Sequence, residues 1–168
     1  MLTSANPGRR GRQVEADVVR LLAERRQTLA LAESCTGGGL AHRVTNVPGA
    51  SAVFPGGVVA YSNAVKRKFL GVRVGTLARN GAVSEAVARE MAAGARKKFG
   101  ADFAIAVTGI AGPGGGTKNK PVGTVFIALA DGRETVVERK MNPSGRGQFK
   151  RDTANQALKM LHSRLTRT

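Results

Sequence analysis

Apolar residues recur along the chain in two patterns, stripes at helical spacing and short continuous runs. One stripe opens the chain with Val14, Val18 and Leu22, and another closes it between Phe149 and Leu165. Short apolar runs are typical of buried strands. Together the patterns predict helices over 13–26, 40–46, 63–70, 85–98 and the C-terminal stretch, and strands over 28–32, 57–61, 103–107, 122–130 and 135–141.

Capping and turn residues stand between these segments. Ser84 is a good N-cap for the helix that follows it, Gly100 lies where a C-terminal glycine cap belongs, and Ser144 is expected to cap the last helix. Asp131-Gly132 predicts a hairpin. Helices and strands alternate early and a hairpin follows, so we expect an α/β fold, a three-layer α/β/α sandwich with a mixed sheet.

Length and composition narrow the class of protein. A chain of 168 residues predicts one domain, here 13–168, after a flexible basic tail over 1–12. One Cys excludes an internal disulfide, and with two His it cannot form a Cys/His zinc site. The chain contains neither an apolar run long enough to span a bilayer nor a signal peptide, so we expect a cytoplasmic protein without a membrane partner.

The charge is unusual. Lys and Arg number 27 against 11 Asp and Glu, a formal net charge of +16. Such a charge favours a polyanion or an anionic small molecule as partner. Nucleic acid is possible but not favoured, because Tyr61 is the only Tyr, Trp is absent, and single strands are usually bound by stacking on aromatic faces. Most of the charge is interpreted as a solvated surface.

Three hydroxyl side chains follow buried apolar runs: Ser34, Tyr61 and Thr108. In open α/β sheets the ligand crevice lies beyond the carboxyl ends of the strands. We therefore expect these three hydroxyls to converge there. The loop 108–121 is rich in glycine but fits neither the P-loop nor the dinucleotide-binding template, so a flexible lid and a ligand loop both remain open.

A glycine turn, Gly37–Gly39, follows the first strand and precedes a helix. Free N–H groups at a helix start bind phosphate or stabilise an oxyanion. The alternative is a tight turn in which Ser34 or Thr36 only caps the helix. Cys35 is either a thiol nucleophile or a small buried residue.

Lys66 lies in the first turn of the helix predicted after Tyr61. Helix N–H groups and neighbouring Arg side chains would lower its pKa, and a neutral amine can act as a general base toward a serine. The alternative is a surface position, because Lys66-Arg67-Lys68 is also a run of charges.

Four segments in this order carry a resemblance: AESCTGG at 32–38, V-x-Y-S-N-x-x-K at 59–66, GAVSE at 81–85 and TGIAGPGGGTKNKPVGTV at 108–125. Over roughly residues 13–165 the chain resembles the C-terminal domain of the CinA family of competence/damage-inducible proteins, whose stand-alone form is a nicotinamide-nucleotide amidase. The resemblance implies hydrolysis of nicotinamide mononucleotide to nicotinate mononucleotide and ammonia. It also implies that the protein needs no metal or organic cofactor and forms a homodimer.

The resemblance assigns roles as well. Ser34 is the preferred nucleophile, Lys66 its base, and Tyr61 orients the pair or relays a proton to the leaving ammonia. Ser51 and Thr108 remain open as alternative nucleophiles, and either of two arginines could hold the phosphate. The implied substrate-binding residues are Thr36, Gly37, Gly38, Ser51, Thr108, Gly109, Arg146 and Arg151. Two other functions stay open: a nucleic-acid-associated protein, and a nucleotide-binding regulator without turnover.

Overall fold

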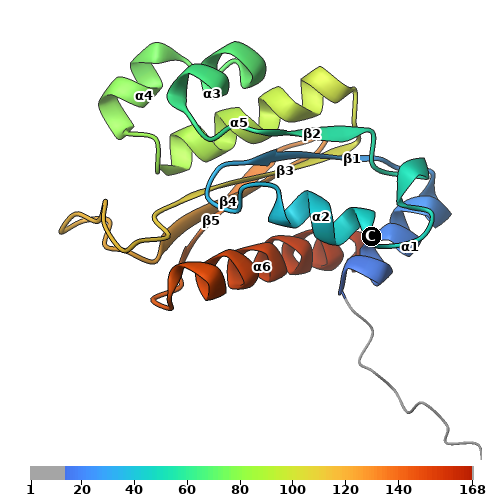
Figure 1. The fold of residues 1–168 in the computed structure, drawn as a ribbon. Coiled ribbons are helices and arrows are strands. Elements are labelled where there is room, and N and C mark those ends of the chain that lie inside the picture. The colour runs from blue at the N-terminus through green and yellow to red at the C-terminus, as the bar shows by residue number, and fades with distance from the viewer. Residues whose placement is uncertain (1–13, 168) are drawn as a thin grey trace, which may run out of the picture.

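The computed structural model describes residues 14–167, and the predicted basic tail over 1–12 lies outside them. Five strands form one open sheet in the order β2-β1-β3-β4-β5 (Figure 1). The strands are β1 (Leu29–Glu33), β2 (Gly56–Val59), β3 (Phe103–Gly109), β4 (Thr124–Ala130) and β5 (Thr135–Met141). β1, β2 and β3 run parallel, whereas β4 and β5 are antiparallel to their neighbours. The predicted mixed sheet is confirmed.

Helices cover both faces of this sheet and complete the three predicted layers (Figure 1). One face carries α1 (Val14–Arg25), α2 (Gly39–Thr45) and α6 (Arg146–Thr166), and the other carries α3 (Asn63–Leu70), α4 (Val74–Asn80) and α5 (Glu85–Phe99). A short 3₁₀ turn, η1 (Ala50–Ala52), precedes β2. An apolar cluster fills each side of the sheet. Within residues 14–167, every helix is too short or too polar to cross a bilayer.

Helix ends agree with the sequence patterns at most positions. The Ser84 hydroxyl accepts a hydrogen bond from the Val87 N–H and caps α5, and Gly100 ends that helix in a left-handed conformation. Ser144 does not cap α6, contrary to the prediction. The N-cap is Gly145, and the Ser144 hydroxyl bonds to the Asp152 carboxylate instead.

Two segments differ from the predicted elements. The sequence patterns missed α4, a seven-residue helix that includes Gly75 and lacks a sustained apolar stripe. β2 ends at Val59, before Tyr61, while β3 continues beyond its predicted end through Thr108 and Gly109. Tyr61 therefore belongs to the turn that leads into α3.

A close contact between α3 and α5 fixes the position of α3. A Cβ atom on Gly94 of α5 would lie 1.8 Å from the Leu70 carbonyl oxygen at the end of α3. Any side chain there would collide with backbone, so the two helices can pack this closely only around glycine. This contact helps to hold α3, and with it Lys66, beside the carboxyl ends of β1 and β2, where Lys66 contacts Ser34 and Ala60.

Candidate active site

A cavity of about 220 Å³ lies at the carboxyl ends of the parallel strands. The turn after β1 supplies Ser34, the turn after β2 supplies Tyr61, and the end of β3 supplies Thr108. The structure thus brings together the three hydroxyl side chains that follow buried strands. The other lining residues are Cys35, Asn63, Lys66, Ala82, Val83, Gly109, Ala111 and Arg146.

Ser34 and Lys66 form a direct pair inside this cavity. The Lys66 Nζ lies 2.9 Å from the Ser34 Oγ and 2.7 Å from the Ala60 carbonyl oxygen. Lys66 is only 1% exposed and Ser34 only 8%, so the surface interpretation of Lys66 is wrong. Burial lowers the pKa of Lys66, because an ammonium group loses its hydration there. The predicted direction is correct, but burial is its cause rather than helix amides or arginines.

Glu33 occupies the N-terminus of α2. Its carboxylate accepts hydrogen bonds from the Gly38 N–H at 3.0 Å, the Leu40 N–H at 3.0 Å and the Ala41 N–H at 2.7 Å. The Thr36 hydroxyl donates to the same carboxylate at 2.6 Å. The protein's own anion therefore fills the place where the sequence predicted a phosphate or an oxyanion.

This arrangement corrects the expectation for the glycine turn. The Gly37 N–H donates to the Ser34 carbonyl oxygen, and the Gly38 N–H donates to Glu33. Thr36 is fully buried. None of these three residues lines the cavity, and neither glycine N–H is left unpaired for a ligand. The turn instead holds Ser34 in place at the end of β1.

Tyr61 and Arg146 stand together at the mouth of the cavity. Tyr61 is 61% exposed, and its hydroxyl oxygen accepts a hydrogen bond of 2.8 Å from Arg146. The same guanidinium donates to the Gly112 carbonyl oxygen at 2.9 Å, which ties α6 to the glycine-rich loop. A fixed arginine at an open mouth is suited to bind an anion, because its planar fork matches carboxylate and phosphate.

Thr108 and Gly109 both lie on the cavity wall. The Thr108 hydroxyl donates to the Ala82 carbonyl oxygen at 2.9 Å, so its proton is engaged in holding the segment before α5. Gly109 packs closely: a Cβ atom there would lie 2.9 Å from the Phe149 ring and from the Thr124 carbonyl oxygen.

Two predicted residues lie elsewhere. Ser51 is exposed in η1, just before Val53, whose carbonyl oxygen accepts from the Leu29 N–H at the start of β1. Ser51 therefore lies near the amino-terminal end of β1, whereas Ser34 follows the carboxyl-terminal end of the same strand. Arg151 bonds to Gln148 on the exposed surface of α6 and does not line the cavity.

Sequence reasoning missed five residues at or beside the site. Four of them line the cavity: Asn63, Ala82, Val83 and Ala111. They fall within segments that carried the family resemblance, but no side-chain chemistry marked them. The Lys150 Nζ lies 3.5 Å from the position a Cβ atom on Gly37 would take. Its spacing of four residues from Arg146 on α6 is the signal that could have found it.

Cys35 is not a reactive thiol in this environment. It is buried, and burial raises its pKa to about 12. The thiol therefore stays protonated near neutral pH, which favours the interpretation as a small buried residue. In the part of the chain that the structure describes, no three His, Cys, Asp or Glu side chains gather as metal ligands would.

The fold and site together define a class: a single-domain, three-layer α/β protein with a buried serine–lysine pair at the carboxyl edge of its sheet. The model of the CinA C-terminal domain matches residues 11–165. The chain belongs to the CinA C-terminal domain family, as the sequence resemblance predicted.

Named relatives agree with this membership. The chain is 54% identical over 150 residues to a CinA-like protein of Parasynechococcus marenigrum, and 51% identical over 153 residues to a CinA-like protein of Thermotoga maritima. These matches cover 88% and 91% of the chain but only 36% and 37% of the relatives. The chain thus spans little more than a third of the length of the curated relatives it matches.

Solved structures of similar proteins superpose on nearly the whole chain. A CinA superfamily protein from Klebsiella pneumoniae superposes with a TM-score of 0.88 at 36% identity, covering 92% of this chain and 97% of that one. A competence/damage-inducible protein from Agrobacterium tumefaciens superposes with a TM-score of 0.84 at 39% identity, covering 98% and 99%.

Proposed function

We propose that this protein is a nicotinamide-nucleotide amidase, which hydrolyses the carboxamide of nicotinamide mononucleotide to nicotinate mononucleotide and ammonia without a metal. The observation that carries the proposal is the buried Ser34–Lys66 pair, with 2.9 Å between Nζ and Oγ. Amide hydrolysis needs an activated nucleophile, and a lysine whose pKa is lowered can activate a serine.

The pair supports a two-step reaction. In its neutral form Lys66 donates one N–H to the Ala60 carbonyl oxygen and offers its lone pair to the Ser34 hydroxyl. The Ser34 oxygen attacks the amide carbon while its proton passes to Lys66. That proton then leaves with the nitrogen as ammonia, and an ester on Ser34 remains. Water then attacks the ester while Lys66 takes one of its protons. As the ester bond breaks, Lys66 returns that proton to the Ser34 oxygen, and the acid departs as a carboxylate with its own proton released to solvent.

The size and charge of the site suit this substrate. Pockets that enclose a whole drug-sized ligand have volumes of about 300–1,000 Å³. The 220 Å³ cavity is smaller, which fits a pyridine ring and its carboxamide inside and a phosphate outside. Arg146 at the mouth is the residue of α6 that would hold the phosphate, and Tyr61 would orient the ring end of the substrate.

The test is ammonia release from nicotinamide mononucleotide in the presence of EDTA. We expect turnover by the unaltered protein and a loss of at least about a thousandfold in Lys66→Met, because removal of a base from a nucleophile pair costs that much or more. Circular dichroism checks that the variant folds. Tight binding of the mononucleotide without ammonia release by the unaltered protein would favour a non-catalytic regulator and contradict the proposal.

A further inference from the structure

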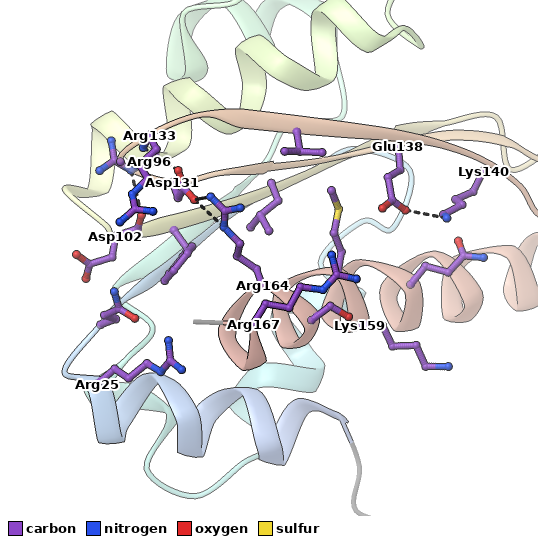
Figure 2. A pocket seen from close by; sticks show the side chains of 18 residues that line it. Arg25, Arg96, Asp102, Asp131, Arg133, Glu138, Lys140, Lys159, Arg164 and Arg167 are labelled. Carbon is purple, nitrogen blue, oxygen red and sulfur yellow. Dashed lines mark hydrogen bonds and ion pairs between the residues drawn. The ribbon is translucent and has the colours of Figure 1, made fainter.

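A second, larger hollow lies between α6 and the sheet, away from Ser34. It measures about 800 Å³, and its lining shares no residue with the cavity around Ser34. It begins at the amino-terminal edge of β3, where Asp102 and Phe103 lie, and follows α6 beside β4 and β5 (Figure 2). We call it the α6 groove.

The α6 groove is strongly cationic. Seven Lys and Arg side chains line it against three acidic ones. The three acids are already engaged: Asp131 pairs with Arg164, Glu138 pairs with Lys140 at 2.7 Å, and Asp102 accepts from the Thr28 N–H at 2.8 Å. Two of the seven cations, Lys140 and Arg164, thus pair with acids of the lining, and Arg133, Lys159 and Arg167 do not.

The cations Arg133, Lys159 and Arg167 are exposed. Within residues 14–167, none of them has a carboxylate partner. Lys159 and Arg167 are eight residues apart on or at the end of α6, a separation of roughly 12 Å at the helical rise. Figure 2 shows the labelled cations spread along the groove, from Arg133 on the hairpin to Lys140 on β5. A spread of this kind suits a chain of repeated negative charges better than one phosphate.

The floor of the groove is apolar. Phe103, Leu129, Val136 and Met160 contribute to it between the charged walls. An apolar strip bordered by cations matches the two parts of a nucleotide chain, since bases and sugars pack on the strip while phosphates meet the walls. The net charge of +16 adds a long-range attraction for such a chain.

We propose that the α6 groove binds single-stranded nucleic acid through its phosphate backbone, without sequence preference. Among the described residues that line the groove, Phe103 is the only aromatic one, so affinity comes from charge more than from stacking. Binding therefore weakens steeply with salt, because each phosphate contact releases a counterion. The site is separate from the proposed amidase site, so the two activities are independent.

The experiment measures fluorescence anisotropy of a labelled oligothymidylate about 20 nucleotides long at several salt concentrations. The test variant is Arg133→Glu with Lys159→Glu in the groove. The matched control is Arg79→Glu with Lys68→Glu, which are exposed on α4 and α3 across the sheet and change the net charge equally. We expect the groove variant to lose at least about tenfold in affinity and to show a shallower salt slope, and the control to lose less than about twofold.

Three results would overturn the proposal. Equal losses of affinity in both variants would mean that the net charge of the protein attracts the oligonucleotide and that the α6 groove is not a binding site. No binding of the oligonucleotide by the unaltered protein at low salt would exclude nucleic acid as the ligand of the groove. Displacement of the oligonucleotide by polyglutamate at an equal concentration of charges would assign the groove to an acidic polypeptide. Ammonia release by the groove variant is expected to be unchanged, since the two sites share no residue.

Discussion

At the scale of single residues, the proposed reaction depends on a lysine that is buried away from solvent. Lys66 is among the largest fully buried side chains of the described residues, and the polar atoms that its Nζ contacts are the Ser34 hydroxyl and the Ala60 carbonyl oxygen. A charged ammonium group in such a place loses hydration, which favours the neutral amine. The same burial that costs stability therefore favours the neutral form that the proposed general base needs.

The pH profile of the proposed reaction tests whether Lys66 acts as a neutral base. Because burial lowers the pKa of Lys66, its neutral fraction grows as pH rises through that lowered value. We expect kcat/KM to rise with pH, with its inflection below the ordinary lysine pKa of about 10.4. An inflection at the ordinary value, or a rate that falls with rising alkalinity while the protein stays folded, would contradict a buried lysine base.

At the scale of elements, the N-terminus of α2 is held by Glu33 rather than left open for a ligand. One carboxylate satisfies three backbone N–H groups of the turn and helix, so the segment that carries Ser34 is fixed from within. A negative charge at a helix N-terminus is also favoured by the helix dipole. Glu33 is thus a positioning residue for the turn.

Replacement of the charged Glu33 carboxylate by a neutral group should destabilise the fold. We expect Glu33→Gln to lower the free energy of unfolding by about 2 kcal/mol, since hydrogen bonds to a charged group contribute about 1.5–3 kcal/mol. Glu24→Gln on the exposed side of α1, which loses only an i,i+4 ion pair, should cost about 0.5 kcal/mol or less. Urea unfolding of both variants measures the difference. Equal small losses would show that Glu33 does not hold the turn.

At the scale of the whole molecule, local patterns located most of the site. The order of strand and loop was enough to bring Ser34, Tyr61 and Thr108 to one edge, because parallel strands end on the same side. Ser62 and Gly71 bound α3 where the sequence predicted. The family resemblance separated Lys66 from the charged surface run around it, which spacing alone could not do.

Other features depended on contacts far apart in the sequence. The partners of the Glu33 carboxylate, and the burial of Lys66, exist only once the layers pack. Arg146 and Arg151 could not be separated without the rotation of α6 about its axis, which turns only Arg146 toward the cavity. Ser51 stayed open as an alternative to Ser34 until the fold placed it near the amino-terminal end of β1.

The most direct test compares these two serines. Ammonia release from nicotinamide mononucleotide is measured for the unaltered protein, Ser34→Ala and Ser51→Ala, with folding checked by circular dichroism. We predict that Ser34→Ala loses at least about a thousandfold while Ser51→Ala keeps nearly full activity, because only Ser34 meets the Lys66 amine. Full activity in Ser34→Ala, or a comparable loss in Ser51→Ala, would contradict a reaction centred on the buried serine–lysine pair.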